Sequence, residues 1–277
     1  MQRYFLVGCP RSGTTLLQQI IMNYFPEIHS VPETQFFSIA NPKNPIKKFV
    51  GWKNLYVQGY NIKLAKKFNL AYKTKYNTPF IGKDYYKGFI ELMDDSAKQN
   101  DKQIWLEKTP RHLHFIDDIS NIPNSKFIHI IRKGEDVVSS LFSATNTYPK
   151  KWVNKNFTKF KGFSIDQCIN RWNNDINITS NYKNDVNHLI ISYEQLIKNI
   201  DKSVKEIQSF VELKPQLNNV GLSNNTEKII ENRELWKANN FKDDIRNRSK
   251  FESIFNSQQR DYIKKQLILN LYMEILS

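Results

Sequence analysis

The segment "GCPRSGTT" has the residue types and spacing of a loop that binds phosphate. Gly8 and Gly13 enclose four residues, and glycines at this spacing let backbone N–H groups approach an anion closely. A loop that holds a nucleoside triphosphate continues with lysine and then serine or threonine, but Thr14 and Thr15 follow Gly13 here. The nearest cation is Arg11, inside the loop. The segment therefore predicts an anion site that works without the usual lysine.

The donors of this loop favour a ligand with fewer phosphates than a magnesium-bound triphosphate. Backbone N–H groups of residues 12–15 would stand at the start of a helix, where free donors and the helix dipole attract phosphate. Ser12, Thr14 and Thr15 add hydroxyl groups. A triphosphate site also needs an acidic residue for magnesium, but the strand "FIHII" ends in Arg132. We therefore expect no bound metal. The alternative to a phosphate-binding loop is a plain glycine- and serine-rich turn between a strand and a helix.

A second candidate phosphate site lies in "IHIIRKGEDVVSSLF". Arg132 ends a predicted strand, and Ser140 follows eight residues later, about two turns into the next helix. Both side chains could reach a second phosphate of the same nucleotide. Arg132 could instead pair with Asp136, and Ser140 could be a small packing residue. Taken alone, the spacing does not decide between these interpretations.

Alternating strands and helices must position these groups. Continuous apolar runs predict buried parallel strands, so we expect an α/β fold with a P-loop-like core, in which helices flank a parallel sheet on both faces. Ligands bind such sheets at the carboxyl ends of the strands, where loops bearing Arg11, Lys108 and Arg132 would converge. Strands are predicted in 3–8, 103–110, 125–132 and 187–192, and helices in 14–25, 112–119, 134–142 and 164–182; residues 26–40 are predicted to be a loop entering a short helix.

Length and composition indicate one sulfur-poor globular domain. The 277 residues, 40% of them hydrophobic, suffice for a single domain over 1–277 with a lysine- and tyrosine-rich insertion around 41–100. The two cysteines, Cys9 and Cys168, lie far apart, which argues against a disulfide scaffold or a zinc ribbon. The sequence contains no run of about 18 apolar residues, so we expect no transmembrane helix. Together with the absence of a signal-peptide pattern, this leads us to expect a cytoplasmic protein.

The formal net charge of +14 predicts anionic partners. Residues 43–87 hold eleven lysines and one acid, and residues 143–163 hold five lysines and no acid. If these segments line the site, the molecule that binds beside the phosphate loop is anionic; a solvated lysine-rich surface explains them equally well. We expect no nucleic-acid partner, because no recognition motif accompanies the charge.

With both phosphate motifs in place, the chain resembles the sulfotransferases that use 3′-phosphoadenosine-5′-phosphosulfate (PAPS). "GCPRSGTTLL" resembles their 5′-phosphosulfate loop, and "FIHIIRKGEDVVSSL" resembles their 3′-phosphate motif, with Arg132 and Ser140 at the family's spacing. "LEKTPRH" is also similar, and the likeness covers roughly 4–35 and 103–142. It implies PAPS as co-substrate and 3′,5′-ADP (PAP) as product, without metal. Arg11 and Lys108 would then stabilise the transition state and the leaving phosphate.

The resemblance also raises the question of the general base. One branch of the family carries Lys-Thr-His and uses that histidine, but this chain has Pro110 in its place, and proline cannot accept a proton. Tyrosylprotein sulfotransferases carry a carboxylate in a "Glu-Glu-Thr" stretch, and "VPET" places Glu33 at nearly the same distance from the loop. We expect Glu33 to be the base; a carboxylate at the start of a helix is the alternative interpretation. His29 and His112 could also take the proton, or could be packing or exposed residues. Glu107 could be a base or could instead orient Lys108.

The remaining assignments rest on weaker likeness. Tyr193, in "ISYEQL", matches a position where the family packs adenine, although an aromatic residue after a strand is often core. The acceptor is expected to bear a hydroxyl on a glycan, a tyrosine or a small molecule. The alternatives are a P-loop kinase with a degenerate lysine and a non-catalytic nucleotide- or polyanion-binding module. Near the C-terminus three cations stay unassigned: Arg246, Arg248 and Lys250.

Overall fold

The computed structural model describes residues 1–40, 54–77, 84–147, 162–216 and 250–277. Its centre is a parallel five-stranded sheet with the order β2-β3-β1-β4-β5. The strands are β1 (Gln2–Gly8), β2 (Ile28–Ser30), β3 (Ile104–Lys108), β4 (Ser125–Ile131) and β5 (His188–Ser192).

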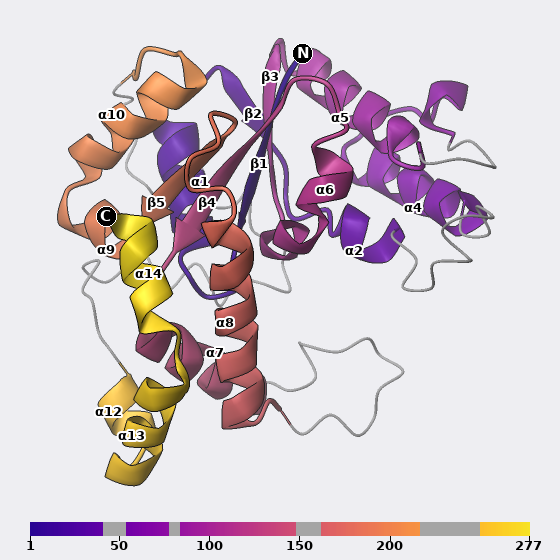
Figure 1. The fold of residues 1–277 in the computed structure, drawn as a ribbon. Helices are drawn as coiled ribbons and strands as arrows, with labels where there is room; N and C mark the ends of the chain where they lie inside the picture. Colours follow the sequence, from indigo (N-terminus) through magenta and orange to yellow (C-terminus); the bar gives the residue numbers. More distant parts are fainter. Residues whose placement is uncertain (41–53, 78–83, 148–161, 217–249) are drawn as a thin grey trace.

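Helices cover both faces of this sheet, as the sequence predicted (Figure 1). Successive side chains of a strand point to opposite faces, so β1 serves two cores. Phe5 and Val7 pack with the helices of one face, whereas Tyr4 and Leu6 pack with those of the other. The first face carries α2 (Phe36–Ala40), α4 (Asn54–Lys67), η1 (Thr74–Tyr76), α5 (Lys87–Gln99), η2 (Pro110–Phe115) and α6 (Ile116–Ile119). The second carries α1 (Thr14–Tyr24), α9 (Tyr193–Lys198) and α10 (Ile200–Val211).

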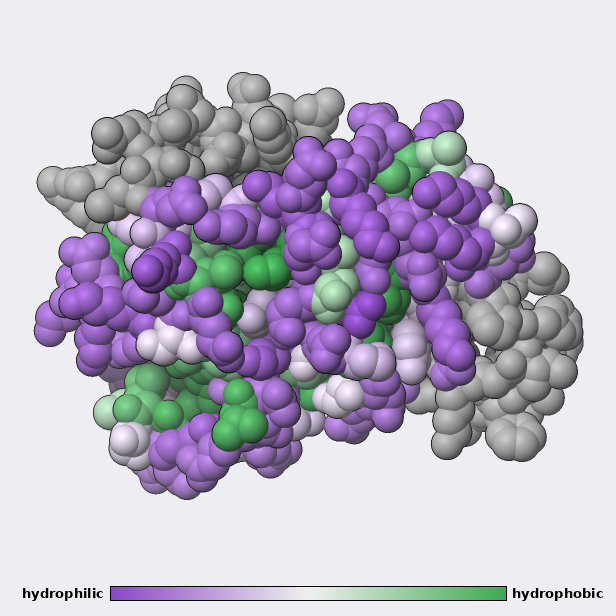
Figure 2. All heavy atoms as spheres, turned by 90° about the horizontal axis from the view of Figure 1, so that it is seen from above, coloured by the Kyte–Doolittle hydropathy of each residue, from purple (hydrophilic) through white to green (hydrophobic). Residues whose placement is uncertain are grey.

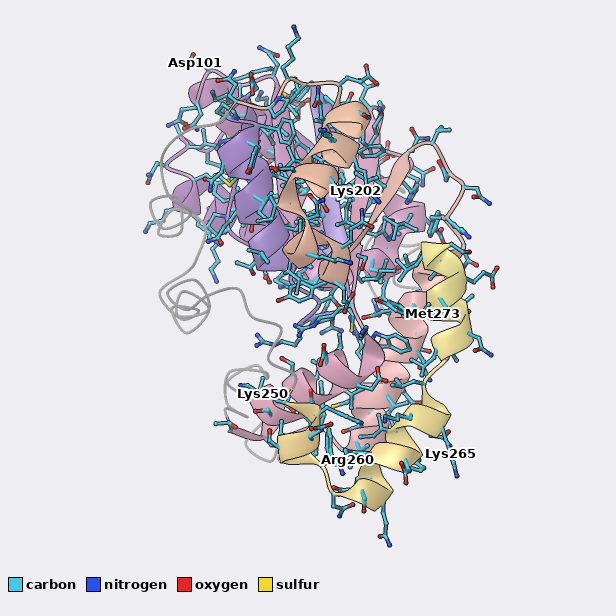
Figure 3. All side chains as sticks on the ribbon, turned by 90° about the vertical axis from the view of Figure 1, so that its left-hand side faces the viewer. Asp101, Lys202, Lys250, Arg260, Lys265 and Met273 are labelled. Carbon is cyan, nitrogen blue, oxygen red and sulfur yellow. The ribbon has the colours of Figure 1, made fainter. Side chains whose placement is uncertain are left out.

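A third hydrophobic cluster lies beyond the carboxyl end of β4 and joins distant parts of the chain. Its members come from the end of β4 and from helices that include the C-terminal ones, and Trp172 is fully buried among them. The helices are α7 (Gly134–Thr147), α8 (Ile165–Ser180), α12 (Phe251–Ile254), α13 (Ser257–Gln266) and α14 (Leu269–Leu276). Figure 3 shows Lys250, immediately before α12, and Arg260 and Lys265, on α13, at the bottom of this layer.

The sequence prediction omitted one strand. Residues 26–40 were expected to form a loop and a short helix, but Ile28–Ser30 pairs with β3 as an edge strand. Three residues between two prolines are too few to show a strand pattern. The strand is held by tertiary contacts instead: the Ser30 hydroxyl donates to the Leu106 carbonyl at 2.7 Å. The short helix that follows is α2, as predicted.

The described surface is mainly hydrophilic, with hydrophobic side chains visible between polar ones when the molecule is seen from above (Figure 2). Within the described ranges, no helix has the length and apolar character needed to cross a membrane.

Candidate functional site

The loop between β1 and α1 has a backbone that requires its two glycines. Gly8 and Gly13 have φ angles of 151° and 95°. A Cβ atom on Gly8 would lie 2.4 Å from the Ile130 carbonyl oxygen, and one on Gly13 would lie 2.4 Å from a ring carbon of Tyr193. The loop is therefore pressed between β4 and the start of α9. Arg11 itself takes the left-handed conformation, with φ 79°.

The hydroxyl of Ser12 faces inward in this loop. Ser12 is fully buried, and its Oγ has no hydrogen-bond partner among the described residues. A buried polar atom without a partner carries a free-energy cost that a bound anion or another polar ligand would remove. Thr14 is also buried and is the first residue of α1.

Arg11 links the two predicted phosphate motifs. Its Nε donates to Ser140 Oγ at 3.0 Å, so the first loop meets the second turn of α7. Burial, together with the nearby positive charge of Arg132, lowers the pKa of Arg11 to about 10. Two guanidinium groups thus share a poorly solvated region, which favours an anion between them.

Arg132 lies directly after β4 and is held on several sides. Its guanidinium stacks 4.2 Å from the centre of the Tyr193 ring and approaches Asp136 at 3.4 Å. Its carbonyl accepts a hydrogen bond from Trp172 Nε1 at 2.9 Å. The Asp136 pairing considered from the sequence is therefore present, yet Nε of Arg132 is buried with no hydrogen-bond partner among the described residues. The arrangement leaves this donor available to a ligand.

Lys108 lies at the end of β3, between the loop and Glu33. Its Nζ is 2.6 Å from Glu33 Oε1 and 3.5 Å from Thr15 Oγ1. The side chain of Lys108 is 2% exposed and that of Glu33 is 13% exposed, so the pair is largely shielded from water. The structure therefore brings together three groups that the sequence placed on different segments.

Three contacts to the Glu33 segment were not foreseen from the sequence. Gln35 Nε2 donates to Glu33 Oε2 at 2.7 Å, and Lys67 Nζ donates to the Glu33 carbonyl at 3.4 Å. The Tyr60 hydroxyl donates to the carbonyl of Thr34. Tyr60 and Lys67 belong to α4, within the lysine- and tyrosine-rich segment. The unusual composition of that segment was the one feature of the sequence that could have pointed to them. Nothing in the sequence marked Gln35.

The other candidate bases lie elsewhere or are fully engaged. His29 pairs in register with Trp105, about 10 Å along β3 from Lys108, and its Nε2 is 2.9 Å from Ser96 Oγ. Burial, helped by the charge of Lys102, lowers the pKa of His29 to about 4. His112 and Glu107 are both fully buried and bond to each other.

Of the remaining groups that the sequence singled out, the structure describes some and not others. Tyr193 contacts both Gly13 and Arg132, so it stands between the two phosphate motifs. Lys250 lies immediately before α12. Arg246 and Arg248 lie outside the described residues, as do 43–53 and 78–83 of the first basic segment and 148–161 of the second. Among the residues that the structure does describe, no cluster of three or more His, Cys, Asp or Glu could hold a metal ion.

Comparison with known proteins gives the chain its family. The Sulfotransferase family profile matches residues 4–216, whereas no curated protein matches. The fold is similar to the sulfotransferase domain from the curacin biosynthetic pathway, with TM-score 0.55 and 16% identity over 96% of each chain. It is similar to the sulfotransferase domain of the Synechococcus PCC 7002 olefin synthase, with TM-score 0.53 and 17% identity over 95% of this chain and 93% of that chain.

Mouse sulfotransferase SULT7A1, solved in complex with PAP, also has this fold, with TM-score 0.51 and 14% identity over 96% of this chain and 82% of that chain. At these identities the solved structures establish the fold alone. The family match covers residues 4–216 of a chain of 277, well over half of its length, and the chain therefore belongs to the sulfotransferase family.

Proposed function

We propose that this protein transfers a sulfuryl group from PAPS to the hydroxyl of an acceptor and releases PAP. The observation that carries the proposal is the position of Lys108, whose ammonium group contacts both Glu33 and the Thr15 hydroxyl of the loop. During sulfuryl transfer, negative charge grows on the leaving phosphate. A cation placed between the base and the anion site can stabilise that charge. We call Glu33 and Lys108 the acceptor side of the site, and Arg11, Ser12, Arg132 and Ser140 the donor side.

The donor side fits an anionic nucleotide. Ser12 Oγ and Arg132 Nε are buried donors without a protein partner among the described residues, and the burial of Arg11 near Arg132 favours added negative charge. The loop from 11 to 15 would hold the 5′-phosphate end, and Arg132 with Ser140 would hold the 3′-phosphate. Tyr193, between the two motifs, would pack against the nucleotide. The PAP complex of SULT7A1, which shares the fold, supports this choice of ligand.

The acceptor side supplies the proton transfer and the charge stabilisation. PAPS contributes the sulfuryl group; its bond to the bridging phosphate oxygen breaks as the acceptor oxygen bonds to sulfur. Glu33, which carries the negative charge of the ion pair, takes the proton of the acceptor hydroxyl. Lys108 and Arg11 stabilise the negative charge that grows on the leaving phosphate. Lys108 has to turn from Glu33 toward the donor for this, and its 3.5 Å contact with the Thr15 hydroxyl of the loop supports such a movement.

We propose that α4, within the insertion around 41–100, helps to form the acceptor site. Its residues Lys67 and Tyr60 donate to the backbone carbonyls of Glu33 and Thr34. Lys67 adds positive charge beside the proposed base, which is consistent with an anionic acceptor such as an acidic glycan or a tyrosine among acidic residues.

A transfer assay with labelled PAPS tests the proposal. The purified chain is incubated, with EDTA present, with a panel of glycans, tyrosine peptides and small hydroxyl compounds. We expect labelled product from at least one class of acceptor and PAP in equal amount, and we expect Glu33→Gln to lower the rate of both about a thousandfold. Labelled product that requires magnesium, or that Glu33→Gln makes as fast as the wild type, would overturn it.

A further inference from the structure

The carboxylate of Glu107 is the centre of a buried hydrogen-bond network that no proposed step uses. Glu107 is fully buried at the next-to-last position of β3, and it points to the face opposite Lys108 because successive strand residues alternate. Its Oε1 accepts from the Thr34 hydroxyl at 2.8 Å, the Thr34 N–H at 3.2 Å and the Thr109 hydroxyl at 2.6 Å. Its Oε2 contacts His112 Nδ1 at 2.8 Å.

Four consecutive backbone N–H groups end in this network. The N–H of Thr34 reaches Glu107 directly, as described. That of Gln35 donates to Thr109 Oγ1 at 3.1 Å, and that of Phe36 donates to Thr34 Oγ1 at 3.2 Å. The N–H of Phe37 donates to His112 Nε2 at 3.2 Å. Each intermediate side chain then donates onward to the same carboxylate, so one buried charge fixes residues 34–37.

The network determines how His112 is protonated. Because the Phe37 N–H points at Nε2, that nitrogen must accept, and the ring proton must lie on Nδ1, where it is donated to Glu107. Burial alone would raise the pKa of Glu107, but His112 and the hydroxyls of Thr109 and Thr34 outweigh it, so the pKa lies below its ordinary value. Both nitrogens of His112 are engaged, which leaves it unable to act as a base in this arrangement.

The turn that this network fixes is the one that bears Glu33. Gln35 takes the left-handed conformation, with φ 55°. This conformation costs a non-glycine residue free energy, so it persists only where the surrounding structure enforces it. The Thr109 hydroxyl bonds the Gln35 N–H at that point, and the Gln35 side chain bonds Glu33 Oε2. Glu107 thus acts on Glu33 through two hydrogen-bonded residues.

We infer that Glu107 is the positioning residue of the acceptor side: with Thr109 and His112 it holds the 33–37 turn so that the Glu33 carboxylate faces Lys108. The inference rests on the proposed function, since it assigns Glu107 a role in the reaction for which Glu33 is the base.

The test compares Glu107→Gln with Asp94→Asn. In Glu107→Gln the side-chain NH2 group would face the Nδ1–H of His112, so two donors would meet. This would disrupt the hydrogen bonds that connect residue 107 through His112 to the Phe37 N–H. Asp94 is a matched control because it is a buried carboxylate that accepts from Trp105 Nε1 at 2.7 Å and pairs with Arg3, nearer the opposite end of β3. Thr109→Val and Thr109→Ser form a gentler pair, since only serine keeps the hydroxyl.

Displacement of a catalytic group by about 1 Å costs up to about a hundredfold in rate. Glu107→Gln should lower kcat about tenfold to a hundredfold, with the Kd for PAP unchanged within about twofold, whereas Asp94→Asn should leave both unchanged. Thr109→Val should lower kcat and Thr109→Ser should restore it. In a Glu33→Gln background, Glu107→Gln should have little further effect. An unchanged kcat in Glu107→Gln, or a full additional loss in the double variant, would overturn the inference.

A readout on the free protein separates this inference from the proposed function. Nitrogen-15 NMR should show His112 as the Nδ1–H tautomer, and Glu107→Gln should shift the amide signals of residues 34–37 while Asp94→Asn leaves them in place. Unshifted amides would overturn the positioning role whatever the reaction is. Shifted amides in a protein that neither binds PAP nor transfers sulfate would refute the proposed function alone.

Discussion

Lys108 ends β3 and Arg132 follows β4, the two strands that flank β1, yet their surroundings differ. On the acceptor side, the ammonium group of Lys108 meets a carboxylate at 2.6 Å, and the turn behind Glu33 is held by the Glu107 network. On the donor side, two arginines lie near each other, and Ser12 Oγ and Arg132 Nε have no partner among the described residues. The first region is built to hold a fixed geometry, and the second is built to receive negative charge.

This difference predicts that variants of the two regions will affect different constants. Changes on the acceptor side should lower kcat and leave PAP affinity intact, because Glu33 and Lys108 act on the reacting atoms. Changes on the donor side should weaken PAP binding first.

Glu33→Gln should have the largest effect, a fall in kcat of about a thousandfold, which is within the range for loss of a general base. The amide keeps the shape of the side chain but cannot take the proton. Steady-state kinetics give kcat, and calorimetry should give a Kd for PAP within about twofold of the wild type. A matching loss of PAP affinity would mean that Glu33 belongs to the donor side.

Lys108→Met should lower kcat about a hundredfold or more, since one electrostatic stabiliser of the transition state is removed while the apolar length of the chain is kept. Single-turnover measurement with labelled PAPS isolates the chemical step. Lys63→Met, on α4, serves as the control for loss of one positive charge. Equal rates for the two variants would contradict a role for Lys108 in transfer.

Arg132→Ala should raise the Kd for PAP about tenfold to a hundredfold, because a charge-assisted contact to phosphate is lost. The kcat at saturating donor should change less than the affinity does. Calorimetry on the wild type and the variant gives the ratio. An unchanged affinity would place the 3′-phosphate elsewhere and remove Arg132 from the donor side.

Glu107→Gln should lower the free energy of unfolding by about 2 kcal/mol at pH 7, as loss of a buried charged acceptor does. The folded pKa of Glu107 lies below the ordinary value of 4.5. Its stabilisation is therefore present above that value and is lost as pH falls through the folded pKa. Denaturant unfolding at several pH values should show the wild type and variant converging in acid. Glu91→Gln, at a half-exposed surface glutamate, should change stability by less than about 0.5 kcal/mol.

Ser140→Ala should have the smallest effect, a loss of about fivefold in PAP affinity, which corresponds to a net contribution of about 1 kcal/mol from one hydrogen bond. The substitution also removes the acceptor of the Arg11 Nε–H bond at 3.0 Å. Calorimetry against PAP and ADP shows whether the loss is specific to the 3′-phosphate. An equal loss for both ligands would indicate that Ser140 acts only through Arg11.

The core strands and the glycine-bounded loop between β1 and α1 could be predicted from the sequence because their signals are local. Apolar runs end at Gly8, Lys108 and Arg132, and parallel order brings those ends to one edge of the sheet. The strand Ile28–Ser30 could not be predicted, since it is three residues long and is stabilised by pairing with β3. Its omission did not affect the site, because Glu33 follows it.

The network behind Glu33 was beyond sequence reasoning for a different reason. The sequence suggested Glu107 as a base or as a group that orients Lys108, and the second idea assumed that neighbours in sequence act together. In the strand, residues 107 and 108 point to opposite faces, so Glu107 serves the 33–37 turn, which lies more than 70 residues earlier in the chain. Only the tertiary fold shows such a pairing.

Calorimetry of PAP binding in EDTA tests the central claim most directly. The account holds that the donor side binds a bis-phosphorylated nucleotide with side-chain cations alone. It predicts tight binding of PAP without magnesium, weaker binding of ADP, and weaker binding of PAP by Arg132→Ala. A preference for ATP with magnesium over PAP would contradict it.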